Sequence, residues 1–140
     1  MGLDAIVYKN AKRLLEAYGD DRIEVDGTTG EACQKDGVQI SIPVELRIAL
    51  RQRLGNMDEI RFLRGEVKRL FGDSDSYLNQ KVLYSSSHSG DILSLSEMQV
   101  ISQEVDVLRQ SNDVRLQTFV ETMDSLIRAS RAELNPIVFV

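Results

Sequence analysis

The chain has 140 residues and a mass of 15.8 kDa, with 42% hydrophobic and 28% charged residues, a composition typical of one globular domain covering residues 1–140. A net charge of −5 argues against nucleic-acid binding, which relies on basic side chains. A single cysteine excludes an internal disulfide, and no signal peptide or membrane-spanning run of about 20 apolar residues is recognisable, so we expect a soluble cytoplasmic protein.

The first 43 residues predict strands and turns with one ambiguous segment. Residues 3–8, "LDAIVY", are apolar and β-branched and predict a buried strand. Residues 9–19, "KNAKRLLEAYG", predict either a short helix closed by Gly19 or irregular chain. Residues 22–43 alternate apolar and polar side chains between glycines, which predicts two or three short strands joined by tight turns. Asp26-Gly27 is the strongest turn signal among them.

Helical spacing predicts two helices after Pro43, a residue suited to a first helical turn. The first carries leucines at positions 46, 50 and 54 on one face and ends at Gly55-Asn56. The second begins near Met57, and its inward stripe comprises Ile60, Leu63, Val67 and Leu70. Residues 74–81, "SDSYLNQK", are expected to form a mobile connector.

The remaining residues predict a strand, two helices and a final strand. Residues 81–86, "KVLYSS", predict the strand, and Ser94 with Glu97 forms a capping box that starts the next helix. A last helix is predicted from Asp113 to Glu133, and the apolar tail "IVFV" predicts an interior strand beside the first strand or "KVLYS". The predicted inward residues of the two helices are Met98, Ile101, Val105 and Leu108, and Leu116, Val120, Met123 and Ile127.

These elements follow the order β-β-β-α-α-β-α-α-β. Strands separated by helix pairs favour the α+β class. We expect a mixed β-sheet of about four to five short strands with about four helices packed on it.

The segment "YSSSHSGDILSLSE", residues 84–97, holds the only histidine, His88. Four serines flank it and Asp91 follows, so the residue types of a Ser-His-Asp triad occur together. Triad members normally come from separate parts of a fold, and no G-x-S-x-G motif occurs. Three interpretations remain: a strand-to-helix connector with Gly90 at positive φ, a partner-binding loop, or a small hydrolase or ligand-binding enzyme with His88 as base and Asp91 as its orienting group. We expect the connector and assign no catalytic residue.

Metal and cofactor motifs are absent from the sequence, so we expect neither a metal site nor a cofactor. The segment "DGTTGE" lacks the lysine of a phosphate-binding loop and predicts a hairpin turn. Cys33 is expected to be a small buried residue. The two middle helices carry seven cations and four acids without interleaved aromatic residues, which predicts a solvated face and no nucleic-acid partner.

Acidic residues concentrate in the second half of the chain. Residues 1–72 hold 12 basic and 12 acidic side chains, whereas residues 73–140 hold 5 and 10. An acidic half suits a basic partner, because complementary fields speed encounter. The predicted partner-binding residues are Ser87, His88, Ser89, Asp91, Glu97, Glu104, Asp106 and Asp113.

Four segments, "MGLDAIVY", "LGNMDEIRFLRGEV", "VLYSSSHSGDILSL" and "NPIVF", resemble a group of small bacterial proteins, some of them labelled immunity proteins of polymorphic toxin systems. The similarity runs in order along nearly the whole chain. It implies an α+β domain that binds and silences a cognate toxin without catalysis. A non-enzymatic binding protein of this kind is the function we expect, with the oligomeric state left open.

Overall fold

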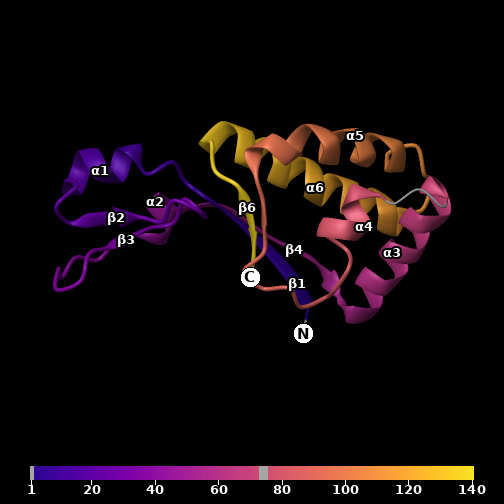
Figure 1. Ribbon diagram of the computed structural model, residues 1–140, viewed down its shortest axis with the longest axis horizontal. Coiled ribbons are helices and arrows are strands. Elements are labelled where there is room, and N and C mark those ends of the chain that lie inside the picture. The colour runs from indigo at the N-terminus through magenta and orange to yellow at the C-terminus, as the bar shows by residue number, and fades with distance from the viewer. Residues whose placement is uncertain (1, 73–75) are drawn as a thin grey trace.

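The computed structural model describes residues 2–72 and 76–140 (Figure 1). Its strands are β1 (Gly2–Tyr8), β2 (Ile23–Val25), β3 (Ala32–Gln34), β4 (Ile48–Asn56), β5 (Ile92–Leu93) and β6 (Ile137–Phe139). Its helices are α1 (Lys12–Tyr18), α2 (Val44–Arg47), α3 (Met57–Phe71), α4 (Tyr77–Lys81), the 3₁₀ turn η1 (Leu95–Glu97), α5 (Met98–Leu108) and α6 (Val114–Glu133).

The fold is α+β, as the sequence predicts. Four strands form a sheet in the order β4-β1-β6-β5, and β2 and β3 form a separate hairpin. Each pair within the larger sheet is antiparallel, whereas the order of elements suggested a mixed sheet. The C-terminal strand β6 lies between β1 and β5, so the predicted interior position beside the first strand is confirmed. This position satisfies both backbone edges of an apolar strand.

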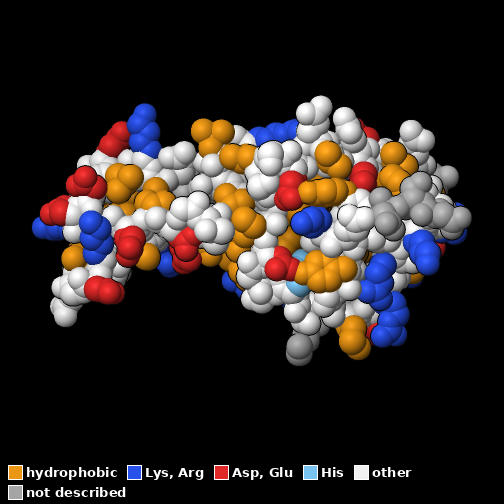
Figure 2. Space-filling model, in the orientation of Figure 1, with side chains coloured by type: hydrophobic (Ala, Val, Ile, Leu, Met, Phe, Trp, Pro, Cys, Tyr) orange, Lys and Arg blue, Asp and Glu red, His pale blue; other side chains and the backbone are white. Residues whose placement is uncertain are grey.

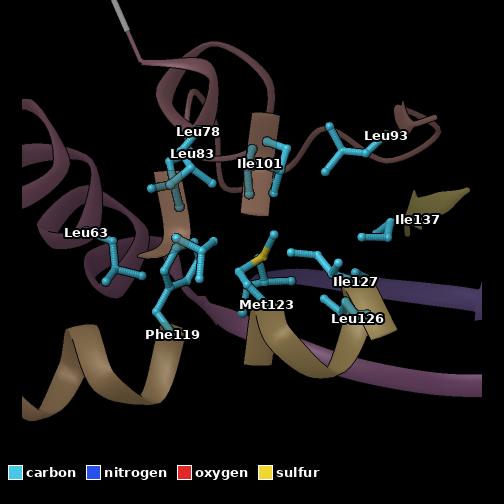
Figure 3. Packing of buried hydrophobic residues seen from close by; sticks show 14 of the residues in the cluster. Leu63, Leu78, Leu83, Leu93, Ile101, Phe119, Met123, Leu126, Ile127 and Ile137 are labelled. Atoms are coloured by element: carbon cyan, nitrogen blue, oxygen red, sulfur yellow. The ribbon is translucent and has the colours of Figure 1, made fainter. Parts of the chain in front are cut away.

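Helices α3, α5 and α6 cover one face of the sheet (Figure 1). Side chains alternate across each strand, so β1 directs Leu3, Ala5 and Val7 to these helices. Ile6 and Tyr8 point to the opposite face, where they are buried in a second small cluster with Val138. The predicted inward stripes of α5 and α6 are buried. Figure 3 shows these stripes meeting over the sheet, with side chains from α3, α4 and the following turn filling the space between them.

Residues 10–42, which we name the hairpin lobe, project from one end of this body (Figure 1). The lobe contains α1 and the β2–β3 hairpin, and its own small core is built on Leu14, Ile23 and Ala32. The ambiguous segment before Gly19 therefore forms a helix. Asn10 donates a hydrogen bond to the Glu133 carbonyl (3.2 Å), which ties the base of the lobe to the end of α6.

The predicted helix over residues 44–54 is wrong. Only α2 is helical, and the chain continues as the nine-residue strand β4. A spacing of four residues fits the period of a helix and that of a strand. In β4, Leu50 and Leu54 face the helices because they are an even number of positions apart. Arg51 and Arg53 alternate with them toward the opposite face of the sheet. Pairing with β1 along the strand favours the strand over the helix.

Three smaller expectations also need correction. The predicted strand at residues 81–86 is a turn, in which Val82 and Leu83 are buried and both donate their N–H groups to the Leu78 carbonyl. Residues 77–81 of the predicted connector form helix α4, while residues 74 and 75 lie outside the described residues. Leu70, placed in the inner stripe of α3 by its spacing, is 37% exposed.

Within the part of the chain that the structure describes, no helix is both long enough and apolar enough to cross a membrane.

Candidate functional site

His88 lies in the loop between α4 and β5, and its side chain is buried. Its ring stacks on Tyr84, with ring centres 4.4 Å apart, and meets the edge of Phe139 in β6 at 4.5 Å. Two backbone hydrogen bonds fix the loop against β6: Gly90 donates to the Phe139 carbonyl (2.8 Å), and Phe139 donates to the Asp91 carbonyl (2.9 Å). The histidine is therefore part of the packing at this edge of the sheet.

Both ring nitrogens of His88 face groups of its own loop. Nε2 lies 2.7 Å from the Val82 carbonyl oxygen and therefore donates to it. Nδ1 lies 3.3 Å from Asp91 Oδ2, yet it makes no directed hydrogen bond with any described residue. Because Nε2 carries the proton that Val82 accepts, it cannot take a proton from a nucleophile in this arrangement. Burial also lowers the pKa of His88.

The serines and glycine of this loop act on the local backbone. The Ser87 N–H donates to Ser85 Oγ (3.1 Å), and Gly90 has a φ of +96°, the positive value expected for it. Ser94 and Glu97 form the predicted capping box at the start of η1. Ser87 and Ser89 are exposed, as is Asp91. The structure thus supports the connector interpretation and leaves these three side chains accessible to a partner.

We expect the fold to lose stability in acid because of His88. Burial lowers the pKa of His88 below its ordinary value of 6.5, so the unfolded chain binds a proton at a higher pH than the folded chain does. The neutral ring contributes fully to the free energy of unfolding above pH 6.5. This contribution is lost as the pH falls from 6.5 toward the lower pKa of the folded state. The free energy of unfolding should change by at most about 1.4 kcal/mol per pH unit, which is the limit for the binding of one proton.

Urea unfolding of the wild type and His88→Gln between pH 5 and 8 measures this slope. The difference between the two proteins isolates the histidine, because all other titrating groups are shared. The wild type should lose more stability than the variant between pH 7 and 5.5. Parallel pH profiles would contradict the assignment of a buried, neutral ring.

Two of the predicted acidic contacts hold the protein's own backbone. Glu104 of α5 accepts hydrogen bonds from the N–H groups of Tyr77 (2.8 Å) and Leu78 (2.9 Å), and so caps α4 from a neighbouring helix. Glu97 accepts from the Ser94 N–H (2.9 Å) and from the Tyr77 hydroxyl (2.6 Å). The hydrogen bond to Glu97 raises the pKa of that tyrosine. Both carboxylates are therefore engaged within the fold.

Two more of the acidic candidates lie near the turn between α5 and α6. Asp113 caps α6 by accepting the Arg115 N–H (2.8 Å), and hydrogen bonds from Arg115 lower its pKa against the opposing effect of desolvation. Asp106 pairs with Arg109 at 3.0 Å, and Arg109 also makes a bidentate contact with Asp124 at 2.7 and 2.9 Å. Asp106, Asp113 and Asp124 are thus already paired with arginines of the same half of the chain.

The β2–β3 hairpin contains the "DGTTGE" turn and Cys33. No cluster of three potential metal ligands occurs among the described residues. Asp26 Oδ1 accepts from the N–H groups of Thr28 (2.7 Å) and Thr29 (3.0 Å), as a tight turn requires, and these bonds lower the pKa of Asp26. Cys33, expected to be buried, is exposed on β3 opposite Glu24. Desolvation and neighbouring carboxylates raise its pKa, so it is not an activated thiolate.

The hairpin lobe carries a charge that the sequence analysis missed. Its 33 residues hold seven acidic and four basic side chains, a net charge of −3. Residues 43–72 hold seven basic and four acidic side chains. Their positive charge cancels the negative charge of the lobe when the charges of residues 1–72 are summed. No ion pair joins a charged side chain of the lobe to another described residue, in contrast to the pairs found in the body. Figure 2 shows these charged side chains gathered over the lobe.

A groove of about 750 Å³ lies between α1, the β2–β3 hairpin and Asn135. Its apolar lining comes from Ala11, Leu15 and Val25, and Glu16 and Asp20 stand among its lining residues. Lys12 also lines it, with Asn10, Gly19, Gly30 and Asn135 completing the lining. Sequence alternation predicted the hairpin, but the groove depends on where the lobe meets Asn135 after α6, a contact between distant segments.

No family model, curated protein or solved structure matches this chain. The resemblance to immunity proteins therefore stays a prediction.

Proposed function

We propose that this protein is a non-enzymatic binding protein that takes up a basic protein partner on the hairpin lobe. The observation that carries the proposal is the combination of an unneutralised charge of −3 with a groove that has apolar walls. Apolar area supplies binding free energy, and a complementary field speeds encounter and disfavours acidic competitors. The resemblance favours a toxin-neutralising immunity protein as the specific form of this function.

The alternative of a hydrolase that uses His88 and Asp91 gains no support from the geometry. Nε2 of His88 contacts the Val82 carbonyl, and no serine hydroxyl of the described residues bonds to either ring nitrogen. A binding protein needs only a complementary surface. The exposed side chains of Ser87, Ser89 and Asp91 stay in the proposal as a second contact surface, outside the lobe.

We expect charge reversal in the groove to slow association with the partner. Glu16→Lys and Asp20→Lys, tested singly, place a cation where the partner's cations approach. Each should reduce the association rate about tenfold at low salt and much less at high salt, because salt screens charge steering. The matched control is Glu121→Lys, an exposed residue of α6 in which the same charge change occurs on the body.

The experiment starts with capture of a partner from host lysate on the wild-type protein, followed by rate measurements with the purified partner. The proposal is supported if one basic protein is captured, if the control variant binds it at the wild-type rate, and if the lobe variants bind it more slowly. Equal rates for all four proteins would refute the lobe as the contact surface. Growth arrest on expression of the partner alone, relieved by co-expression, would establish the immunity function.

A further inference from the structure

Strand β4 presents a long open edge. It pairs with β1 on one side, and no strand among the described residues pairs with its other side. Among the backbone hydrogen bonds that the described residues make outside helices and strands, none involves residues 49–55 of this strand. A nine-residue edge is long for a four-stranded sheet, and its free N–H and C=O groups are a template for another strand.

On the face opposite the helices, this edge is basic. Arg51 and Arg53 alternate along β4, and their side chains are 59% and 53% exposed. Both contact one carboxylate, Asp4 of β1, at 3.5 and 3.3 Å. One carboxylate between two guanidinium groups leaves a positive charge. A strand laid against β4 would therefore be favoured if it placed carboxylates opposite these arginines, since opposite charges directly across strands stabilise pairing.

The helix face of the same edge is hollow and largely apolar. A cavity of about 280 Å³ lies where the end of β4 meets α3 and α6. Leu54, Phe62, Leu63, Val114 and Phe119 supply its apolar walls. An added strand would direct every second side chain to the helix face, because side chains alternate between the faces of a sheet. The side chain opposite the end of β4 would meet this cavity.

The polar side chains around the cavity are engaged elsewhere. Glu59 accepts the Asn56 N–H (3.0 Å) in the capping box of α3, and Arg115 lies over the Phe62 ring at 3.4 Å. Thr118 and Thr122 donate their hydroxyls to carbonyls one turn earlier in α6. The cavity therefore offers apolar contact to an entering side chain without an unsatisfied polar group.

We propose that the outer edge of β4 accepts an extended segment of a partner protein as an added strand, in which acidic side chains alternate with apolar ones. Acidic residues face Arg51 and Arg53, apolar residues enter the cavity beside Leu54, and backbone hydrogen bonds join the strands. This site is separate from the groove of the hairpin lobe and opposite to it in charge. A single protein could thus hold two partners, or two segments of one partner.

The test uses labelled peptide Val-Glu-Val-Glu-Val-Glu-Val and fluorescence anisotropy with the whole protein. A peptide of the same composition with its glutamates in one block lacks the alternation and should bind at least tenfold more weakly. N-methylation of alternate residues removes the backbone donors on one side of the peptide only. One set of N-methyl groups should abolish binding and the other should leave it intact, as strand addition requires.

On the protein side, Arg51→Glu should weaken binding of the acidic peptide about tenfold and should create binding of the corresponding Val-Lys peptide. That exchange of preference shows that the variant is folded. The matched control is Arg61→Glu, a change of an exposed arginine on α3 that should leave both affinities unchanged.

Equal binding of the block peptide, equal sensitivity to both sets of N-methyl groups, or an equal loss in the control would overturn the proposal. So would a wild-type dimer that Arg51→Glu dissociates, because the edge would then be occupied by a second copy. Because the probe is a defined acidic peptide, failure here leaves the lobe's basic partner untouched.

Discussion

Replacement of Phe139 by alanine is expected to lower the free energy of unfolding by about 3–5 kcal/mol, the cost of removing a large aromatic side chain from a packed core. Phe139 is 1% exposed, lies in an interior strand and belongs to the main apolar cluster. Its ring also supports the ring of His88, so the variant should let water reach the histidine. Urea unfolding gives the stability change directly.

Val140→Ala is the control for this experiment. It changes the neighbouring residue, whose side chain is 37% exposed, and should shift stability by no more than about 0.5 kcal/mol. A loss below about 1.5 kcal/mol for Phe139→Ala would mean that β6 is not held in the middle of the sheet. The acid sensitivity assigned to His88 should shrink in the same variant, because a hydrated ring titrates nearer its ordinary pKa.

Glu104→Ala is expected to cost about 2–3 kcal/mol. The carboxylate accepts two charge-assisted hydrogen bonds from the first turn of α4, and alanine would leave the N–H groups of Tyr77 and Leu78 without this partner. Glu104→Gln keeps an acceptor oxygen, so its free energy of unfolding should lie between those of the wild type and Glu104→Ala. The measurement is urea unfolding at pH 7, with Gln103→Ala, an exposed change on the same helix, as the matched control.

Equal stability of Glu104→Ala and the control would show that α4 needs no cap from α5. A large loss would change the interpretation of any binding experiment at this residue, because weaker binding by a Glu104 variant would then report unfolding of α4. Glu97, which joins Ser94 and Tyr77, needs the same caution.

The sequence predicted those elements whose pattern fits only one structure. Residues 3–8 combine β-branched side chains with an apolar run, and the tail at 137–140 needs two neighbouring strands because it is apolar on both faces. The Ser94–Glu97 capping box was predictable because both partners lie within one turn. Helices α5 and α6 have stripes of period 3.6, which a strand could not bury on one side.

The failures came from patterns that fit two structures or from contacts between distant segments. Leu50 and Leu54 suit a helix and a strand equally, and only pairing with β1 decides. The predicted contact Glu104 looked like a free surface acid because its hydrogen-bond partners lie 26 and 27 residues away. The acidic lobe was concealed because the basic residues of β4 and α3 balance it within the same half of the sequence.

The interior position of β6 also bears on how the protein is made. Because β6 is synthesised after every other described element of the sheet, the ribosome exposes β1 and β4 long before the strand that separates β1 from β5 exists. During this interval the free edge of β1 carries the apolar residues Ala5, Ile6 and Val7, a sequence prone to pair with other nascent chains. The fold must therefore close after translation of its last strand, and holdase chaperones that bind extended apolar segments should raise its yield.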